Sequence, residues 1–245
     1  NYKVKPELNA VGPWNLKSPQ DDLNREYFAE FVDIVVQALQ SDTLQYRGKF
    51  WEFPPQGFVN PHDHPVYVDY GSGVDADMAV NRVGIAPRPL QTTVPLYGGF
   101  SQSLTTAKFW ARYKGRPIIL SSNTEFLELL WKEWTEEAKI HGHDVQPGDQ
   151  ACWGGVMVCA ETDAKAQKLF EDYEWFWKTW PTPFGQGMPG LLVGSPETLN
   201  RKIDEVSKAV PINEAFLLLP QGLHTPDEIL DSLDLFSRKV MPNHG

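Results

Sequence analysis

Residues 94–122 read VPLYGGFSQSLTTAKFWARYKGRPIILSS, and the order of residue types in this stretch decides the fold class. An apolar run at 94–99 ends in two glycines, a hydroxyl-rich segment follows, and a second apolar run occupies 117–121. Two apolar strands that flank one helix form a βαβ unit, in which the strands are parallel. The stretch therefore predicts strands at 94–99 and 117–121 and a helix at 102–113.

The turn between the first strand and the helix carries the groups that hold a phosphate. The N-terminus of a helix offers backbone N–H groups and the positive end of the helix dipole. Glycine lets the backbone come close to a ligand, and hydroxyl and amide side chains add hydrogen bonds. The residues that we predict to bind a phosphate are Gly98, Gly99, Gln102, Ser103 and Thr106. The simpler alternative is that Ser101 or Ser103 only caps the helix.

The alternation of strand and helix continues to the end of the chain. We predict further strands at 151–160 and 214–219, and helices at 123–141, 163–180 and 226–240. Capping signals lie at Ser122 with Glu125, at Thr162, and at Thr225 with Glu228. Repeated βα units indicate an α/β fold, with a parallel sheet and the helices packed outside it.

The part of the chain before residue 94 shows no repeated βα units. Apolar residues on one helical face predict a helix at 22–40, and residues 44–53 resemble a short hairpin around Arg47 and Gly48. Residues 54–89 are rich in proline and glycine, and we interpret them as a long ordered insertion or loop. Because composition does not change sharply along the chain, we predict that residues 1–245 are one domain.

Four βα units make half of an eight-stranded barrel. Alone they would leave two parallel edges and an uncovered barrel interior, which proteins normally avoid. The first residue is Asn rather than Met, within a segment that reads like a loop. We therefore expect strands one to four of the barrel to come from a longer polypeptide or from another chain.

Composition argues against two classes of partner. The formal net charge of −10 disfavours nucleic acid, which is bound by Lys and Arg, and it disfavours anionic membrane surfaces. The chain has no apolar run near the ~20 residues of a spanning helix and no signal peptide, so we expect a cytoplasmic protein. Cys152 and Cys159 are seven positions apart on one strand and should face opposite ways, without a disulfide.

Four segments, taken in order and with their spacing, resemble a known family over nearly the whole chain. They are TLQYRGKFWEF at 43–53, RPLQTTVPLYGGFSQSLTTAKFWARYKGRPIIL at 88–120, AETDAKA at 160–166 and VGSPE at 193–197. Together they look like the bacterial luciferase-like, flavin-dependent monooxygenases. Each motif alone tolerates many residues, and only their combination is specific.

The resemblance implies a TIM-type (βα)8 barrel, of which this chain would be strands five to eight with the preceding helix. It implies a monooxygenase that uses O2 and reduced FMN, supplied by a flavin reductase, to oxygenate a small organic substrate. In the family the helix after the fifth strand binds the flavin phosphate, which points to Gln102, Ser103 and Thr106 here. The backbone at 98–100 would lie near the ring or the ribityl chain of the flavin.

Two alternatives stay open. A deazaflavin in place of FMN would make the protein a hydride-transfer oxidoreductase, and the residues that would face the ring lie partly in the missing half. Alternatively, the chain is a non-catalytic flavin-binding or assembly protein, a shortened barrel that forms a homo-oligomer across its open edges. We assign no catalytic residue.

The histidines give weaker signals. Residues 62–64 read His-Asp-His, but no third and fourth ligand follows at a familiar spacing, so we expect a polar loop and no metal site. His141 and His143 follow a helix end, where cations interact well with the dipole. His224 comes just after the last predicted strand and is a candidate for a role at the barrel mouth.

An aromatic run and a glycine-rich segment follow the third predicted strand. Tyr173, Phe176, Trp177 and Trp180 have the spacing of a buried helical stripe, with a pocket for an apolar substrate as the alternative. Trp175 falls outside that stripe and could serve an interface. Residues 181–190 are a candidate lid because glycines permit hinge motion.

Overall fold

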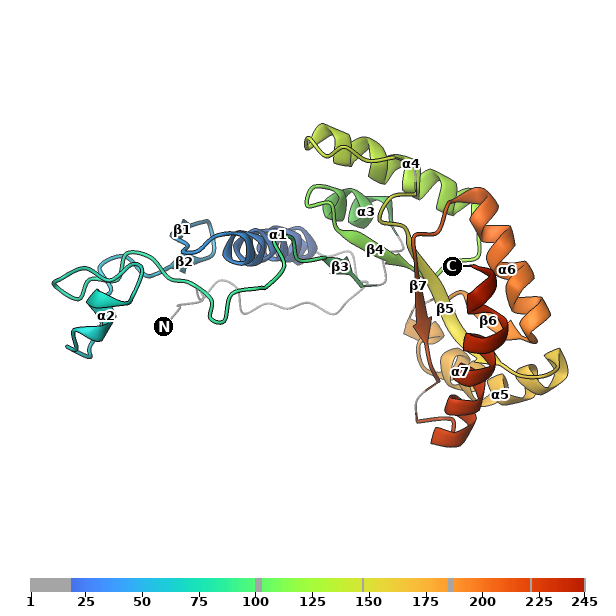
Figure 1. Ribbon diagram of the computed structural model, residues 1–245. Helices are drawn as coiled ribbons and strands as arrows, with labels where there is room; N and C mark the ends of the chain where they lie inside the picture. Colours follow the sequence, from blue (N-terminus) through green and yellow to red (C-terminus); the bar gives the residue numbers. More distant parts are fainter. Residues whose placement is uncertain (1–18, 100–102, 147, 185–186, 221, 245) are drawn as a thin grey trace. The chain divides into compact units, whose positions relative to one another are not determined.

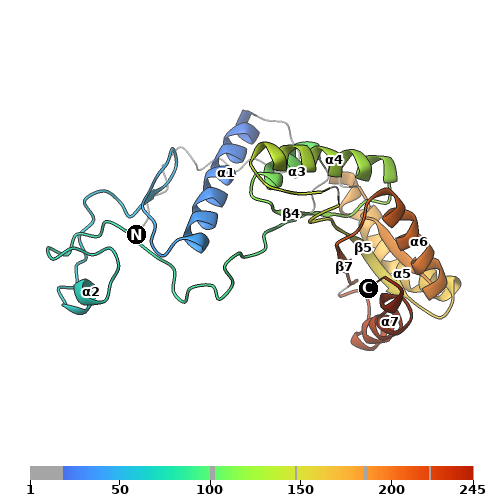
Figure 2. The same cartoon turned by 45° about the horizontal axis from the view of Figure 1, so that its top comes forward.

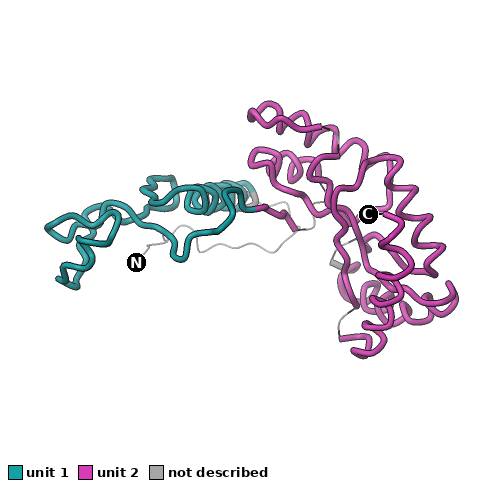
Figure 3. The backbone as a smooth tube through the Cα atoms, in the orientation of Figure 1, with its two compact units in different colours: residues 1–94 teal, residues 95–245 magenta. Residues whose placement is uncertain are grey.

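The computed structural model describes residues 19–99, 103–146, 148–184, 187–220 and 222–244. Backbone contacts divide the chain into two compact units, residues 1–94 and residues 95–245 (Figure 3). The single domain stays a prediction.

The first unit is built on one long helix and a short hairpin. Helix α1 is Pro19–Gln40, and strands β1 (Tyr46–Arg47) and β2 (Glu52–Phe53) pair antiparallel, which confirms the predicted helix and hairpin. The Glu30 carboxylate accepts hydrogen bonds from the N–H groups of Phe50 and Trp51, at 3.0 and 2.7 Å. This carboxylate therefore joins the helix to the hairpin, over a core of Ile34, Leu44, Phe50 and Trp51.

Residues 54–89 form an ordered excursion within this unit, with one short helix, α2 (Val66–Asp69). Isolated antiparallel bridges join Leu44 to Val83, Val59 to Ala79 and Val74 to Val80. The Arg82 guanidinium donates to the Thr43 hydroxyl at 2.6 Å. The bridge from Leu44 to Val83 and the Arg82–Thr43 bond therefore join this segment to the start of the hairpin region.

The second unit is an α/β structure with five parallel strands (Figure 1). The strands are β3 (Tyr97–Gly98), β4 (Arg116–Ile119), β5 (Cys152–Cys159), β6 (Leu191–Gly194) and β7 (Glu214–Leu218). The helices are α3 (Leu104–Ala111), α4 (Thr124–Ile140), α5 (Asp163–Thr179), α6 (Pro196–Ala209) and α7 (Pro226–Lys239), with short 3₁₀ turns at Thr182–Phe184 and Met241–Asn243. The predicted α/β class with a parallel sheet is confirmed, and the arrangement is consistent with part of a barrel.

Strand β5 is the centre of the sheet and pairs with three neighbours. Its first half pairs with β4 on one edge and with β7 on the other, and its second half pairs with β6. Two adjacent glycines permit this. A Cβ on Gly154 would lie 1.6 Å from the Phe216 carbonyl oxygen of β7, and one on Gly155 would lie 2.0 Å from the Gly190 carbonyl oxygen. Any larger residue would force the strands apart.

Strand β6 is an addition to the predicted fold, because residues 181–194 read as a Gly/Pro-rich passage. The Gly190 N–H donates to the Leu120 carbonyl at 3.0 Å, so β6 continues the line of β4 along the same edge of β5. The apolar run Leu191–Val193 is only three residues long, too short for a periodic pattern to reveal a strand.

After β5 the chain returns to the edge of β5 that β4 occupies, and this return determines which face of the sheet α5 covers. Side chains of α3, α4, α6 and α7 pack in one core with Trp153, Met157 and Leu192 of the sheet. Phe170 of α5 packs instead with Val156 and Val158, which face the opposite way along the strands. Connections between parallel strands are right-handed. The connection from β5 to β6 crosses the sheet in the opposite direction from those between β4 and β5 and between β6 and β7. Helix α5 therefore covers the other face, which corrects the expectation that every helix packs outside the sheet.

Helices α3 and α4 run side by side along the first face (Figure 2). The Trp134 indole N–H donates to the Gly115 carbonyl at 3.1 Å, so this buried aromatic ring also fixes the turn before β4.

Most of the predicted helix starts are confirmed. The side chains of Thr162 and Thr225 each accept a backbone N–H at the start of their helices, and Thr225 with Glu228 forms a full capping box. Ser195 caps α6 in the same way. One prediction is wrong. Asn123, not Ser122, caps α4, since its side-chain amide oxygen accepts the Phe126 N–H at 3.0 Å. Asn is as good a cap as Ser, and spacing alone did not separate the two.

The two cysteines lie on opposite sides of β5, as predicted. Cys152 packs with Ile118 and Leu120, and Cys159 lies in the core between the sheet and the helices. Both are free thiols, and burial raises the pKa of the Cys159 thiol to about 11. Among the described residues, none of the helices is both long enough and apolar enough to cross a membrane.

Candidate functional site

The turn between β3 and α3 is the predicted phosphate site. Its two glycines differ. Gly98 is buried, and a Cβ there would lie 1.9 Å from the Trp110 indole nitrogen, so packing requires glycine at this position. Gly99 is exposed, and no atom of the described residues outside its chain neighbours lies within 4 Å of a Cβ placed on it, which leaves room for a ligand beside its backbone. Gln102 lies outside the described residues, as do Phe100 and Ser101.

Ser103 and Thr106 form the first turn of α3. The Ser103 hydroxyl accepts the Thr106 N–H at 3.2 Å and is hydrogen-bonded to the Thr106 hydroxyl at 2.8 Å. Ser103 is therefore a helix cap, the simpler of the two roles considered for it. Intrahelical bonding begins with the Ala107 N–H, which donates to the Ser103 carbonyl. The N–H groups of Leu104 and Thr105 precede it and have no acceptor within a helix, so the turn keeps donors for an anion.

A second feature lies at the carboxyl end of β4. A cavity of about 710 Å3 opens between the start of α4, the approach to β6 and helix α6. It is lined by Leu120, Ser121, Ser122, Asn123, Thr124, Phe126, Trp153, Met188, Pro189, Gly190, Leu191, Arg201, Lys202, Glu205 and Val206. Ser121 and Ser122, which follow Leu120 just after β4, thus lie on its wall. In an α/β sheet, the carboxyl ends of the strands are where ligands bind.

Hydrogen bonds fix the walls of this cavity. The Trp153 indole N–H donates to the Ser121 carbonyl at 2.6 Å, which ties the end of β4 to β5. The Lys202 ammonium donates to the carbonyls of Leu191 and Val193, at 3.2 and 3.0 Å. Burial lowers the pKa of Lys202. Arg201 and Glu205 form an ion pair at 2.9 Å on the outer part of α6.

The opposite end of the sheet holds a network of charged and polar side chains. Arg116, at the start of β4, forms an ion pair with Glu214 and a hydrogen bond with Gln150. The Tyr97 hydroxyl donates to the other Glu214 oxygen at 2.7 Å and accepts from Arg116 at 3.0 Å. These residues begin three strands or precede one, so the network joins the amino ends. Sequence reasoning missed this network, because its four residues are far apart in the sequence and come together only in the folded sheet.

The histidines have structural contacts. His64 accepts the Val66 N–H at 3.2 Å, within a local turn of exposed residues, and the described residues contain no cluster of three potential metal ligands. His143 contacts the Arg112 carbonyl at 2.9 Å, and His141 contacts Glu137 at 3.2 Å at the end of α4. His224 contacts the Leu169 carbonyl of α5 at 2.6 Å.

The aromatic run on α5 is divided between packing and exposure. Tyr173 stacks on Trp177 with ring centroids 5.9 Å apart and contacts the core around Phe170. Trp175 and Trp180 are 60% and 57% exposed. The predicted stripe is therefore buried only in part. Trp175 is exposed and lies outside the stripe, as predicted, whereas Trp180 is exposed although the spacing placed it in the stripe.

Comparison of the structure with solved proteins finds the same fold in several enzymes. The monooxygenase RslO1 from Streptomyces bottropensis has 17% identity and a TM-score of 0.64 over 91% of this chain and 63% of its own. The oxygenating constituent of 3,6-diketocamphane monooxygenase from Pseudomonas putida, a type II Baeyer–Villiger monooxygenase in complex with FMN, has 18% identity and a TM-score of 0.62, over 92% and 64%.

A third similar structure is the coenzyme F420-dependent tetrahydromethanopterin reductase from Methanopyrus kandleri, with 16% identity and a TM-score of 0.56, over 91% and 63%. Neither a family model nor a curated protein matches the sequence. At these identities the likeness concerns the fold, and the chain spans less than two thirds of the length of these proteins.

Proposed function

We propose that this chain is part of a flavin- or deazaflavin-dependent oxidoreductase, and that the turn between β3 and α3 binds the phosphate of the cofactor. In the form we favour, the enzyme is a luciferase-like monooxygenase. It takes reduced FMN from a flavin reductase and oxygenates a small organic substrate with O2. Bound reduced flavin supplies the electrons for this chemistry, and the protein positions and shields it.

The observation that supports this proposal most is the geometry of that turn. Gly99 leaves open space at the backbone, and the first N–H groups of α3 begin five positions later at Leu104, beside the hydroxyls of Ser103 and Thr106. A phosphate is an anion with several acceptor oxygens, and this combination of donors suits it. The same fold holds FMN in the similar monooxygenase from Pseudomonas putida.

The other half of the site has to come from elsewhere under this proposal. Ile118, Leu120 and Cys152 form an apolar cluster on the sheet face opposite α3 and α4, together with Phe216 and Leu218. In a closed barrel, this face is the interior and is filled by layers of side chains from all strands. We propose that four further strands cover it, from a longer polypeptide or from a partner chain, and keep water from the flavin.

A deazaflavin is the second candidate, because two similar structures are F420-dependent enzymes with TM-scores of 0.56 and 0.59. With that cofactor the reaction would be hydride transfer instead of oxygenation. A phosphate-binding turn serves either cofactor. A non-catalytic, homo-oligomeric flavin-binding protein is the remaining alternative.

Titration of the full chain, with any partner that co-purifies, tests the proposal. FMN, riboflavin and F420 are compared by fluorescence, and riboflavin reports the affinity without a phosphate. We expect Thr106→Ala to weaken FMN binding by about 1–3 kcal/mol, the range for hydrogen bonds to a charged group, and to leave riboflavin binding unchanged. Thr105→Ala is the matched control, since it removes an exposed hydroxyl from the same turn. Equal effects of the two variants on FMN would contradict the assignment.

A further inference from the structure

The cavity beside α6 is a second candidate site, built from residues that the proposed phosphate turn does not use. Its lining comes from the end of β4, the start of α4, residues 188–191 and α6. Its volume of about 710 Å3 lies in the range of ~300–1,000 Å3 that small-molecule sites occupy.

One wall of the cavity is apolar. Trp153 and Val206 are each 4% exposed, and Phe126 and Leu191 add partly buried hydrocarbon surface. The Trp153 indole N–H is already bonded to the Ser121 carbonyl. Its ring therefore offers a flat apolar surface, and a ligand that covers it gains from apolar burial without competing for that hydrogen bond.

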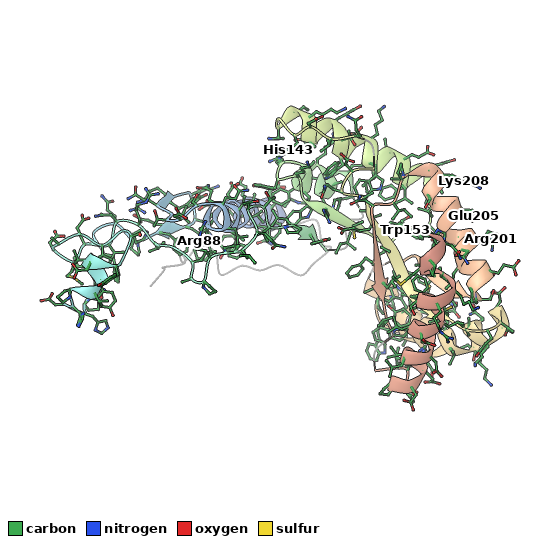
Figure 4. The ribbon with its side chains drawn as sticks, in the orientation of Figure 1. Arg88, His143, Trp153, Arg201, Glu205 and Lys208 are labelled. Carbon is green, nitrogen blue, oxygen red and sulfur yellow. The ribbon has the colours of Figure 1, made fainter. Side chains whose placement is uncertain are left out.

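The other wall is charged. Arg201 and Lys202 are adjacent on α6, and Figure 4 labels Arg201 and Glu205 on this helix and Trp153 on β5. Glu205 is the one carboxylate among the described residues of the lining, and it forms an ion pair with Arg201 at 2.9 Å. Lys202 donates to two neutral carbonyls, which use two of its three N–H donors. The lining thus carries two cations and one anion, a net positive charge in a chain of net charge −10.

From these two walls we propose that the cavity binds a small organic acid with an apolar, preferably aromatic, body. The carboxylate accepts hydrogen bonds from Arg201 and Lys202, and the apolar body lies against Trp153 and Phe126. The capping bond occupies only the side-chain oxygen of Asn123, so its NH2 group is a further, neutral donor beside the two cations.

The probes are naphthalene-2-carboxylate, naphthalene-2-methanol and naphthalen-2-ylmethylamine, which share an aromatic body and differ in charge. Each is titrated calorimetrically into the full chain without flavin. We expect saturable binding of the carboxylate, about tenfold weaker binding of the alcohol, and none of the amine. Equal affinity for all three, or no saturation by the carboxylate, would overturn the proposal.

Three variants of α6 localise the binding. Arg201→Gln should weaken carboxylate binding about fivefold, and Glu205→Gln should tighten it, because it removes the competing carboxylate. Lys208→Gln makes the same charge change as Arg201→Gln about two turns further along the helix, outside the lining, and should have no effect. If Arg201→Gln and Lys208→Gln act alike, or Glu205→Gln weakens binding, the acid does not bind in this cavity.

Discussion

The two ends of the parallel sheet are built in opposite ways. At the amino end, Arg116, Tyr97, Glu214 and Gln150 bond to one another across several strands. At the carboxyl end lie the exposed backbone of Gly99, the N-terminus of α3 and the cavity beside α6. The polar groups of the amino end bond to one another, whereas we propose that polar groups at the carboxyl end also bind a ligand. Stability and binding should therefore respond to different substitutions.

The largest expected loss of stability comes from the amino end. Arg116→Ala removes one ion pair and two hydrogen bonds at once, and its side chain is only 20% exposed. We expect it to lower the free energy of unfolding by about 1.5–3 kcal/mol, the range for hydrogen bonds to charged groups. Urea unfolding measures this.

Arg238→Ala is the control for that experiment. It also removes an Arg–carboxylate pair, with Asp234, but both side chains are more than half exposed. Exposed pairs of this spacing contribute about 0.3–0.5 kcal/mol. If both variants lose the same stability, the amino-end network has no special role and the contrast between the two ends fails.

A smaller effect is expected where α4 begins, at the carboxyl end. Asn123→Ala removes the cap that accepts the Phe126 N–H and should cost about 1 kcal/mol. Ser122→Ala, the neighbouring position that the sequence pattern favoured as the cap, should be near neutral because Ser122 is exposed. Thermal unfolding of both variants separates them. A larger loss from Ser122→Ala would mean that the helix begins one residue earlier.

The sequence predicted the elements better than their arrangement. The caps at Thr162 and Thr225 and the opposed faces of Cys152 and Cys159 follow from local patterns, and they are confirmed. Strand β6 was missed because three apolar residues give no period, and with it the position of α5 on the opposite face.

The candidate sites show the same limit. The turn at 98–106 was readable because its glycines and hydroxyls are adjacent in sequence, although the structure gives Gly98 a packing role against Trp110. The cavity was not predicted, because Trp153 and Arg201 lie far from Ser121 in sequence and meet only when β6 turns back beside β5. The amino-end network was not predicted for the same reason.

The smallest expected change in stability accompanies the most direct test of the proposed function. Ser103→Asp keeps a side-chain acceptor at the helix cap, since Asp caps as well as Ser, and it adds a negative charge where the phosphate would bind. The measurement compares FMN and riboflavin binding to the wild type and to this variant. We predict unchanged unfolding, unchanged riboflavin affinity, and an FMN affinity reduced to that of riboflavin. If Ser103→Asp binds FMN as tightly as the wild type, Ser103 is only a cap and the phosphate does not bind at α3.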